Sequence, residues 1–496
     1  WQQKDLKTYL LADQNIHWMI IAISVMAALF SGISYLGAPA ESFFHNLSYL
    51  WVIISFFIAT PIATLLFLPF FRGLNVITAY EYLERRFDRR LRRLASALFL
   101  GRVTLYVATA IYGPALAISA ITNLSLTQSI LITGVTATIY TSLGGMKAVI
   151  WTDAIQFLVL CGGIVLILAF IAWDLPGGLA RGWTLAAEDG KIQFWNFDPN
   201  PSARVTVWAG LLGGTAGNLV QLVTDQIAVQ RYLTAKSLRE AQRALWLKLW
   251  VTLPVVSLFY LTGTLLYGYY KAHPDRVPAF SNAALVSNLH QPAESQLTKP
   301  LSNDQLLPYF VVNQLPTPIP GMLIAALYGA TMAVVSAGIN SLATAALMDF
   351  RGQLPNTIMS DRSRVKLARR LTFGFGVLAT ALAFVIGALG TLIQISIMII
   401  GIFGGPLLGV FLLGALVPRA NATGALAGLA AGIITAIVVA FPRPFFHTDI
   451  SFLWIGFASS LIAFGVGWLA SFFSAPPTPE QISLTYGGNG LRANRV

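Results

Sequence analysis

WTDAIQFLVLCGGIVLILAFIAW, residues 151–173, is the stretch that decides the fold class. It is long enough to cross a lipid bilayer, because a membrane-spanning α-helix needs about 20 predominantly apolar residues. Its apolar residues are nearly consecutive, whereas the strands of a transmembrane β-barrel alternate apolar and polar residues. We therefore predict that this stretch is a membrane-spanning α-helix.

The composition extends this prediction to the whole chain. Of its 496 residues, 56% are hydrophobic and only 10% are charged, whereas soluble domains carry about 25% charged residues. Similar apolar stretches recur along almost the entire sequence, so we predict an all-α polytopic membrane protein. The single cysteine, Cys161, excludes an intrachain disulfide and a cysteine-based metal site.

Long apolar runs predict twelve helices. Their expected ranges are 18–38, 46–71, 94–121, 126–143, 150–173, 205–225, 244–271, 319–350, 369–390, 391–418, 421–441 and 449–473.

The basic residues of the connecting loops predict the orientation. The loop 72–93 holds seven Arg, and the loop 351–370 holds six Lys and Arg. If every helix crosses the membrane, both loops lie on one side, and the long loops 174–204 and 272–318, where charges roughly balance, lie on the other. Because cytoplasmic loops are enriched in Lys and Arg, we expect the basic loops on the cytoplasmic side of the cell (inner) membrane. This topology accounts for the net charge of +12 without a nucleic-acid partner.

Two glycine-rich stretches interrupt helices that open corresponding halves of the chain. They are FSGISYLGAP at residues 30–39 and GLLGGTAGN at residues 210–218. In transporters built from inverted repeats, the binding site lies where two corresponding helices lose their regular winding. Small residues also allow close packing between membrane helices. Both interpretations of these glycines remain open at this point.

Few polar residues fall inside the predicted helices. Asn218 and Gln221 lie one turn apart in the helix expected at 205–225, and amides in hydrocarbon need hydrogen-bond partners. Tyr106 is either a packing aromatic or part of a pocket wall. Asp153 is either an interfacial charge near a helix terminus or part of an ion path.

Several motifs resemble the solute:sodium symporter family. They are YTSLGGMKAVIWTD at 140–153, QRYL at 230–233 with AKS at 235–237, Asn340-Ser341 with Met348-Asp349, and GGPLLG at 404–409. Leu105-Tyr106 with IYGPAL at 111–116 is most similar to the branch that holds the sodium/iodide and sodium/monocarboxylate transporters. Residues 233–242 also resemble the bacterial sodium/galactose transporter. The resemblance implies a five-plus-five inverted-repeat (leucine-transporter-like) core with flanking helices and alternating access.

On this basis the chain divides into four parts. We expect an N-terminal interfacial segment at 1–17, a ten-helix transport core at 18–418, two additional transmembrane helices at 419–473 and a polar, disordered or loosely docked tail at 474–496. Within the core, 18–173 and 205–418 are the expected repeats. The family usually has one more helix before this core, so we expect a segment that precedes residue 1.

The resemblance places the substrate pocket at Ser31, Ser34, Tyr106, Asn218 and Gln221. Asn218 matches an amide that hydrogen-bonds sugar in the galactose transporter, Ser34 stands where a Gln is often found, and Gln221 replaces an aromatic inner gate. These side chains suit a small polar solute, such as a sugar, sugar acid or monocarboxylate. No Arg or Lys is placed in the pocket, so an anionic solute is allowed but not required.

The resemblance also places a sodium site. Backbone carbonyls of Ala27, Phe30 and Ala330 are expected to contribute, together with the side chains at Ala333 and Val334. In the family these two positions carry hydroxyls, and here neither side chain has an oxygen. Because sodium, like other hard cations, prefers oxygen ligands, we expect weak sodium binding at this site.

Two further expectations concern the ion. Asp153, with Gln156, is expected to line the ion path, because the family uses an acid there for ion binding and release. Thr331 and Ser336 flank the sodium site, but a helix turns 100° per residue, which points them to other faces.

We therefore predict a secondary active transporter that takes up a small polar organic solute by sodium symport. The alternatives are a sodium-independent facilitator or proton-coupled carrier on the same fold and, as a minor one, a solute-sensing membrane protein. No enzyme is expected, because no nucleophile–base pair or metal ligand set appears in the helices. No cofactor is expected beyond Na⁺ as a possible coupling ion, and no partner beyond membrane lipids and the solute. We expect the protein to function as a monomer.

Overall fold

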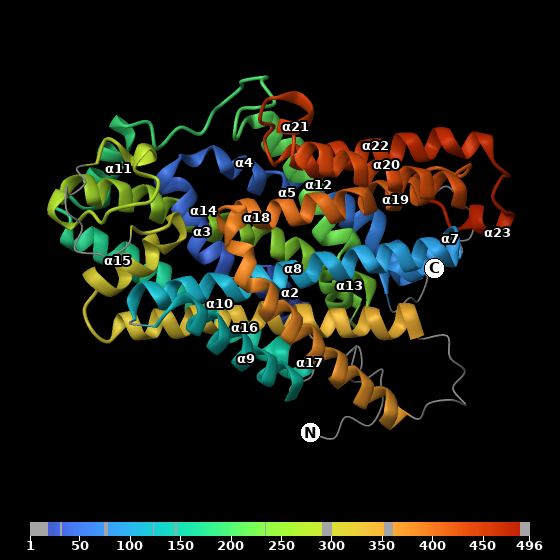
Figure 1. Ribbon diagram of the computed structural model, residues 1–496, viewed down its shortest axis with the longest axis horizontal. Coiled ribbons are helices and arrows are strands. Elements are labelled where there is room, and N and C mark those ends of the chain that lie inside the picture. Colours follow the sequence, from blue (N-terminus) through green and yellow to red (C-terminus); the bar gives the residue numbers. More distant parts are fainter. Residues whose placement is uncertain are drawn as a thin grey trace.

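The computed structural model describes residues 18–29, 32–73, 78–122, 124–143, 146–233, 235–289, 300–351 and 361–486. In these residues the chain is mainly helical and connecting loops join the helices, with an isolated β-bridge between Phe280 and Leu301. Nine of the described helices are long and apolar enough to cross a membrane. Most of the long helices run along the long axis of the molecule, while α9 and α17 are inclined to it (Figure 1). The prediction of an all-α polytopic membrane protein is confirmed.

The helices of the first half follow the predicted ranges closely. They are α2 (Trp18–Leu29), α3 (Gly32–Phe44), the continuous run α4 (Leu50–Ile54), α5 (Phe56–Ile62), η3 (Ala63–Phe67) and α6 (Leu68–Gly73), then α7 (Ala79–Arg86), α8 (Arg89–Ile121), α9 (Leu126–Leu143) and α10 (Met146–Asp174).

The helices of the second half follow in the same way. They are η4 (Ala209–Gly213), α12 (Gly214–Leu219), η5 (Val220–Thr224), α13 (Gln226–Leu233), α14 (Leu238–Ala272), α16 (Ile319–Ala345) with η9 (Ala346–Arg351), α17 (Asp361–Ile386), α18 (Leu392–Ile399), η11 (Ile400–Gly404) and α19 (Gly405–Leu416). The elements outside the two halves are α11 (Gly178–Glu188), η8 (Asn303–Gln305), α15 (Leu306–Gln314), α20 (Ala422–Ala440), α21 (Arg443–Phe446), α22 (Trp454–Ala470) and α23 (Pro479–Ser483).

Capping residues explain why two helices begin before their apolar runs. Asp88 Oδ1 accepts a hydrogen bond from Leu91 N at 2.8 Å, which starts α8 at Arg89. Ser237 Oγ accepts from Glu240 N at 3.2 Å, which starts α14 at Leu238. Such caps satisfy backbone amides that have no partner in the first turn. Both helices therefore begin five or six residues earlier than hydropathy alone predicts.

The two glycine-rich stretches behave differently. α2 ends at Leu29 and α3 begins at Gly32, while Phe30 and Ser31 lie outside the described residues. By contrast, residues 209–224 stay helical through the whole second glycine cluster, with π-helical turns on either side of α12. The backbone leaves the helix only at Asp225, where φ is −88° and ψ is 114°.

The second cluster therefore stays helical, although its π-helical turns depart from regular α-helical winding, and its glycines at 210, 213 and 214 also serve close packing. A Cβ on Gly213 would overlap the carbonyl oxygen of Leu453. A Cβ on Gly214 would lie 2.6 Å from Ser55 Oγ. Because glycine has no Cβ, neighbouring backbones approach each other at these positions.

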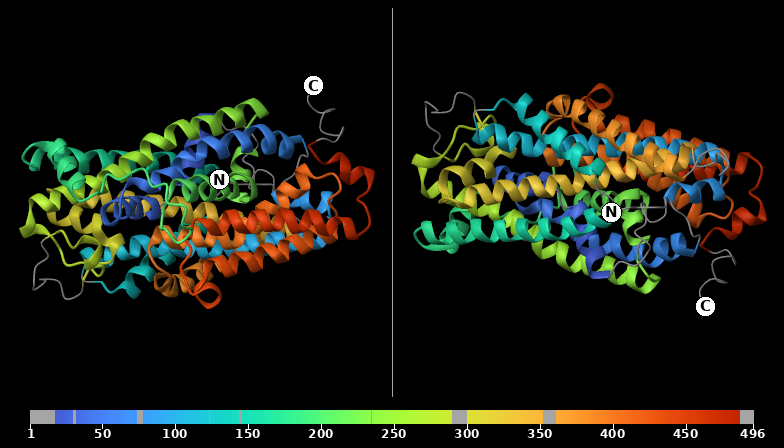
Figure 2. Two further views of the ribbon diagram at one scale, coloured as in Figure 1. Left: turned by 90° about the horizontal axis from the view of Figure 1, so that it is seen from above. Right: turned by 90° about the horizontal axis from the view of Figure 1, so that it is seen from below.

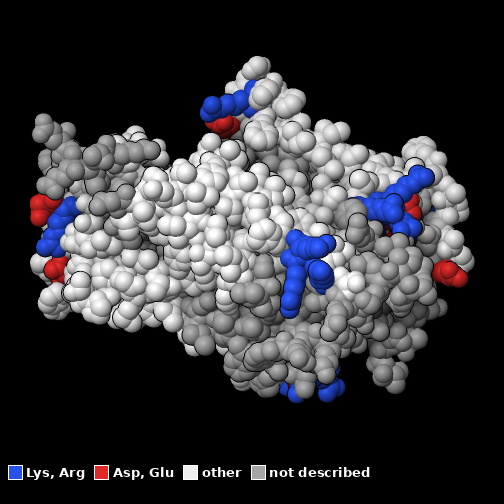
Figure 3. Space-filling model, turned by 60° about the horizontal axis from the view of Figure 1, so that its bottom comes forward, with Lys and Arg blue, Asp and Glu red and all other residues white. Residues whose placement is uncertain are grey.

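The connecting segments lie at opposite ends of the long axis. α7 and α23 are at one end, and α11 and α15, from the long loops, are at the other (Figure 1). Figure 3 shows a wide white area between the charged group at the left end of this face and the blue side chains in its right half. The loop 72–93 and the long loops 174–204 and 272–318 therefore contribute helices at opposite ends of the molecule. Which end faces the cytoplasm remains a prediction.

The C-terminal helices pack on one flank of the core. α20 and α22 contact each other and α19, and the views of Figure 2 show them side by side. Part of the expected tail is helical and lies against the core. Gln481 Nε2 donates to the Phe87 carbonyl at 2.9 Å, and Tyr486 N donates to the Ala415 carbonyl at 2.8 Å.

Candidate functional site

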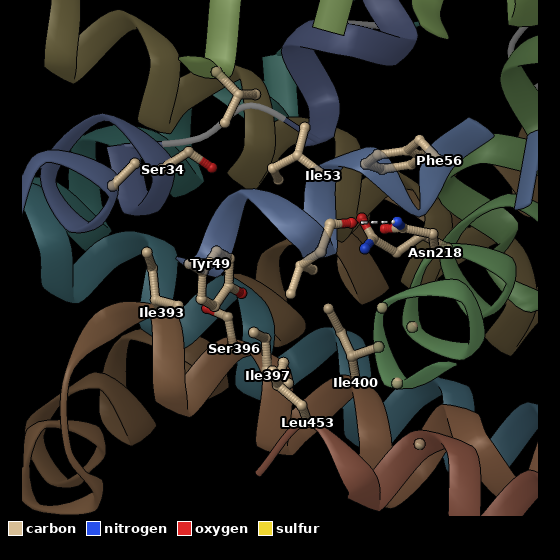
Figure 4. A pocket seen from close by; sticks show the side chains of 18 of the residues that line it. Ser34, Tyr49, Ile53, Phe56, Asn218, Ile393, Ser396, Ile397, Ile400 and Leu453 are labelled. Atoms are coloured by element: carbon tan, nitrogen blue, oxygen red, sulfur yellow. Dashed lines mark hydrogen bonds between the residues drawn. The ribbon is translucent and has the colours of Figure 1, made fainter. Parts of the chain in front are cut away.

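A cavity of about 160 Å³ lies between α3, α4, α5, α8, η4, α12, η5, α14, α18, η11 and α22. Four of the five residues expected to bind substrate line it: Ser34, Tyr106, Asn218 and Gln221. The fifth, Ser31, lies outside the described residues. Figure 4 shows Ser34 and Asn218 on opposite sides of this space. Ser396 of α18 also lines it. The fold therefore gathers residues from four separate helices around one cavity.

Most of the remaining wall is apolar. It includes Ile33, Ile53 and Val256, together with Tyr49 and Tyr260, whose rings stack with centroids 5.7 Å apart. Pockets for small organic molecules have this character, with a few polar groups set in a mainly hydrophobic surface.

Asn218 connects α12 to the segment between α4 and α5. Its side chain is buried, and Nδ2 donates to the Val52 carbonyl at 3.1 Å and to Ser55 Oγ at 3.0 Å (Figure 4). These bonds occupy both amide hydrogens and leave Oδ1 as an acceptor towards the cavity. Asn218 therefore has a structural role in addition to any contact with a solute.

Gln221, one turn further along, is half-buried in η5. The hydrogen bonds of the described residues include none made by its side chain. Because Gln221 lines the cavity, its amide donor and acceptor are available to a ligand.

Lys248 of α14 also lines the cavity. The expectation that no basic residue reaches the pocket is therefore wrong. Its position in the predicted helix 244–271 was readable from the sequence, and a charged residue within a membrane helix is itself a sign of function. Only the packing of α14 against α5 shows that it faces inward.

The expected sodium site lies on α16. Ala330, Ala333 and Val334 are all buried, and α16 is a regular α-helix from Ile319 to Ala345. The flanking hydroxyls bond to their own helix: Thr331 Oγ1 donates to the Leu327 carbonyl at 3.1 Å, and Ser336 Oγ to the Ala333 carbonyl at 3.0 Å. No irregularity of the helix brings these hydroxyls to positions 333 and 334.

The other expected ion residues lie at the edge of what the structure describes. Ala27 is in α2 and Phe30 follows that helix, but the Ala27 side chain and the whole of Phe30 are outside the described part. Asp153 and Gln156 lie in α10, and their side chains are likewise not described. Their roles remain predictions.

Comparison with known proteins now identifies the family. Residues 9–432 match the sodium:solute symporter family. The chain belongs to this family. The sodium-dependent multivitamin transporter of Oryctolagus cuniculus is 32% identical over 491 residues, covering 98% of this chain and 70% of that protein. Sodium-coupled monocarboxylate transporter 1 of Mus musculus is 34% identical over 445 residues, covering 88% of this chain and 68% of that protein.

Solved structures agree with this assignment. A substrate-bound, outward-open Na⁺-coupled sialic acid symporter superposes with a TM-score of 0.83 at 27% identity, covering 96% of this chain and 94% of the other. A nucleobase-cation-symport-1 family transporter shares the fold at 13% identity, with a TM-score of 0.54. The resemblance to the family and the leucine-transporter-like fold of this symporter are thus both confirmed.

A buried ion pair stabilises the break in the helix after η5. Asp225 Oδ2 lies 2.6 Å from Arg102 Nη2 of α8, and Asp225 Oδ1 accepts from Ile227 N at 2.9 Å, at the start of α13. Tyr80 OH donates to the Thr224 carbonyl at 2.7 Å. Sequence patterns did not single out this break, because no glycine or proline marks it.

The acid of the Met348-Asp349 motif has a similar structural role. Asp349 Oδ1 accepts from Arg92 Nη2 at 2.7 Å and from Thr78 Oγ1 at 2.9 Å, while Oδ2 accepts from Ser96 Oγ at 2.9 Å. These bonds join the end of α16 to α8 and to the segment before α7. Because both charges are buried, loss of either one would leave its partner uncompensated.

Proposed function

We propose that this protein is a secondary active transporter that takes up a small polar organic solute by sodium symport through alternating access. The observation that carries the proposal is the cavity in which Ser34, Tyr106, Asn218 and Gln221 meet. Family membership and the sodium-coupled relatives support sodium as the coupling ion. The solute classes that fit are a sugar, a sugar acid or a monocarboxylate. The protein acts as a monomer in the cell membrane, with its basic loops in the cytoplasm.

One observation favours a second function on the same fold. Ala333 and Val334 provide no side-chain oxygen where this family binds sodium, and α16 is regular around them. A sodium-independent facilitator or a proton-coupled carrier would not need these ligands.

Uptake into proteoliposomes separates the two functions. Sodium, proton and voltage gradients are imposed one at a time on purified protein, with candidate solutes of the three classes. We expect a sodium gradient to drive accumulation. Accumulation driven by a proton gradient alone, or equilibration that no gradient affects, would replace sodium symport with the second function.

A substitution at Gln221 tests the location of the site. Gln221→Leu removes an amide that faces the cavity, and a polar solute group left without its partner loses about 1–3 kcal/mol, which is roughly a 5- to 150-fold weaker affinity. Affinity is measured by concentration-dependent uptake. Gln128→Leu, at an exposed position of α9, is the matched control and should leave uptake unchanged. Equal affinities in the two variants would place the solute elsewhere.

A further inference from the structure

The α14 wall of the cavity carries a buried lysine that has no counter-charge. Lys248 is 1% exposed, and its Nζ has neither a hydrogen-bond acceptor nor a carboxylate among the described residues. The ammonium group lies 3.7 Å from the centroid of the Phe56 ring. This cation–π contact covers one side of the group and leaves its remaining N–H donors towards the cavity.

Such an arrangement is unfavourable for the empty protein. Moving an ammonium group out of water costs far more than one aromatic contact returns. Ionisable residues kept in membrane segments usually pair with each other or serve transport. The cost is offset when an anion of the solute occupies the cavity.

The acids of neighbouring elements do not supply this anion. None of the described residues that line the cavity is acidic. Asp225 is paired with Arg102 at 2.6 Å, and Glu41 with Arg204 at 2.7 Å. Glu240 lies on α14 itself, but eight residues away, which is about 12 Å along the helix axis.

A second unsatisfied group lies beside the lysine. Thr252, one turn further along α14, also lines the cavity, and its buried Oγ1 has no partner within the described part of the chain. Residues four apart share one face of a helix. The wall therefore presents an ammonium and a hydroxyl close together, and a carboxylate has two oxygens that can accept from both.

We propose that Lys248 and Thr252 form a carboxylate-binding subsite, so that the transported solute is a small organic acid. This inference rests on the proposed transport function and narrows its substrate class. The carboxylate pairs with Lys248, Gln221 and Ser34 contact polar groups on the rest of the molecule, and Ile53 with its apolar neighbours covers the carbon skeleton. A neutral sugar would leave the ammonium group uncompensated, and a cationic solute would be repelled by it.

Matched pairs of probes test the subsite directly. Nicotinate and nicotinamide, and propionate and propionamide, differ mainly in the charge of the carboxyl group. Binding to the full chain is measured at pH 7.5 in the presence of sodium, by ligand-induced shifts of the melting temperature. We expect the unmodified protein to bind the acid of at least one pair at least about tenfold more tightly than the amide, because charge-assisted bonds are roughly twice as strong as neutral ones.

Three variants test whether Lys248 and Thr252 cause the preference for the acid over the amide. Lys248→Met should reduce the acid-to-amide ratio to about one, while Lys248→Arg should retain most of it. Thr252→Val should weaken acid binding about five- to tenfold, the loss of one hydrogen bond. Without ligand, Lys248→Met should melt at or above the temperature of the unmodified protein, because an apolar side chain replaces an uncompensated buried charge. A lower melting temperature would show that Lys248 is structural and would overturn the subsite.

The remaining outcomes separate this inference from transport itself. Equal binding of acids and amides, or binding of neither, overturns the carboxylate subsite. If chloride shifts the melting temperature as much as the organic acids do, the site binds inorganic anions, and the carboxylate subsite is overturned. If the sodium gradient drives uptake of the amides, and this uptake is unchanged in Lys248→Met, the subsite is rejected and the transport function is retained. Acid binding without uptake under any gradient would reject the transport function alone.

Discussion

Serine at positions 333 and 334 of α16 should strengthen sodium binding at the site expected between α2 and α16. Both native side chains are buried, at 2% and 0% exposure, and neither has an oxygen. The double variant Ala333→Ser with Val334→Ser places two hydroxyls where this family provides them. If sodium binds between α2 and α16, these hydroxyls complete its ligand set.

The structure sets the size of the expected effect. A serine within a helix can donate to the carbonyl four residues earlier, as Thr331 does to Leu327 at 3.1 Å. The new hydroxyls therefore need not remain unsatisfied, and their lone pairs stay available to the ion. A bond between a polar group and a charged one contributes about 1.5–3 kcal/mol. Allowing for dehydration and imperfect geometry, we expect half-saturating sodium to fall at least about tenfold, or about 1.4 kcal/mol.

Sodium titrations of the melting temperature and of solute uptake provide the assay. An ion that binds only the folded state stabilises it by about 2.7 kcal/mol at 100 times its dissociation constant. The double variant should show this stabilisation at lower sodium than the unmodified protein, and uptake should depend more steeply on sodium. Ala345→Ser is the control, since it adds one buried hydroxyl to the same helix about 18 Å away.

The reasoning fails if the unmodified protein already responds to sodium below the millimolar range. It fails equally if a sodium ion is resolved between the carbonyls of Ala27 and Ala330 without the added serines. Either result would mean that backbone oxygens suffice, or that ligands from other elements complete the site.

Two further predictions concern the ends of the molecule. Burial raises the pKa of Asp304 to about 7, although the Leu392 amide donates to Oδ2 at 3.0 Å and lowers it. The protonated acid is the form that the fold favours, so this stabilisation falls progressively from about pH 4 to about pH 7. Asp304→Asn should remove this loss, and a melting temperature of the unmodified protein that stays constant from about pH 4 to about pH 7 would contradict it. In a Cys161→Ser background, a membrane-impermeant thiol reagent added to intact cells should label a cysteine at the exposed position Asp275 and spare one at the exposed position Ser363. The reverse pattern would invert the orientation.

The positions of the transmembrane helices were predictable because length and hydropathy are local properties. Residues 126–143 were predicted as a helix and form α9 with the same bounds. Two of the errors at helix ends came from the caps Asp88 and Ser237, which extend helices into their polar flanks. Residue types also identified the family and the polar side chains that line the cavity.

Tertiary packing decided what the sequence left open. Gly213 and Gly214 are compatible with unwinding and with close contact, and only the approach of Leu453 and Ser55 shows the close contact. Hydropathy places Lys248 close to the start of a helix at 244–271, whereas α14 begins at Leu238, and only the contact with Phe56 shows that its ammonium group faces inward. The charge and size of a residue can be read from the sequence. The neighbours that compensate its charge or limit the space around it come from distant segments. Those neighbours exist only once the helices have packed, and so the character of the site is a property of the tertiary structure.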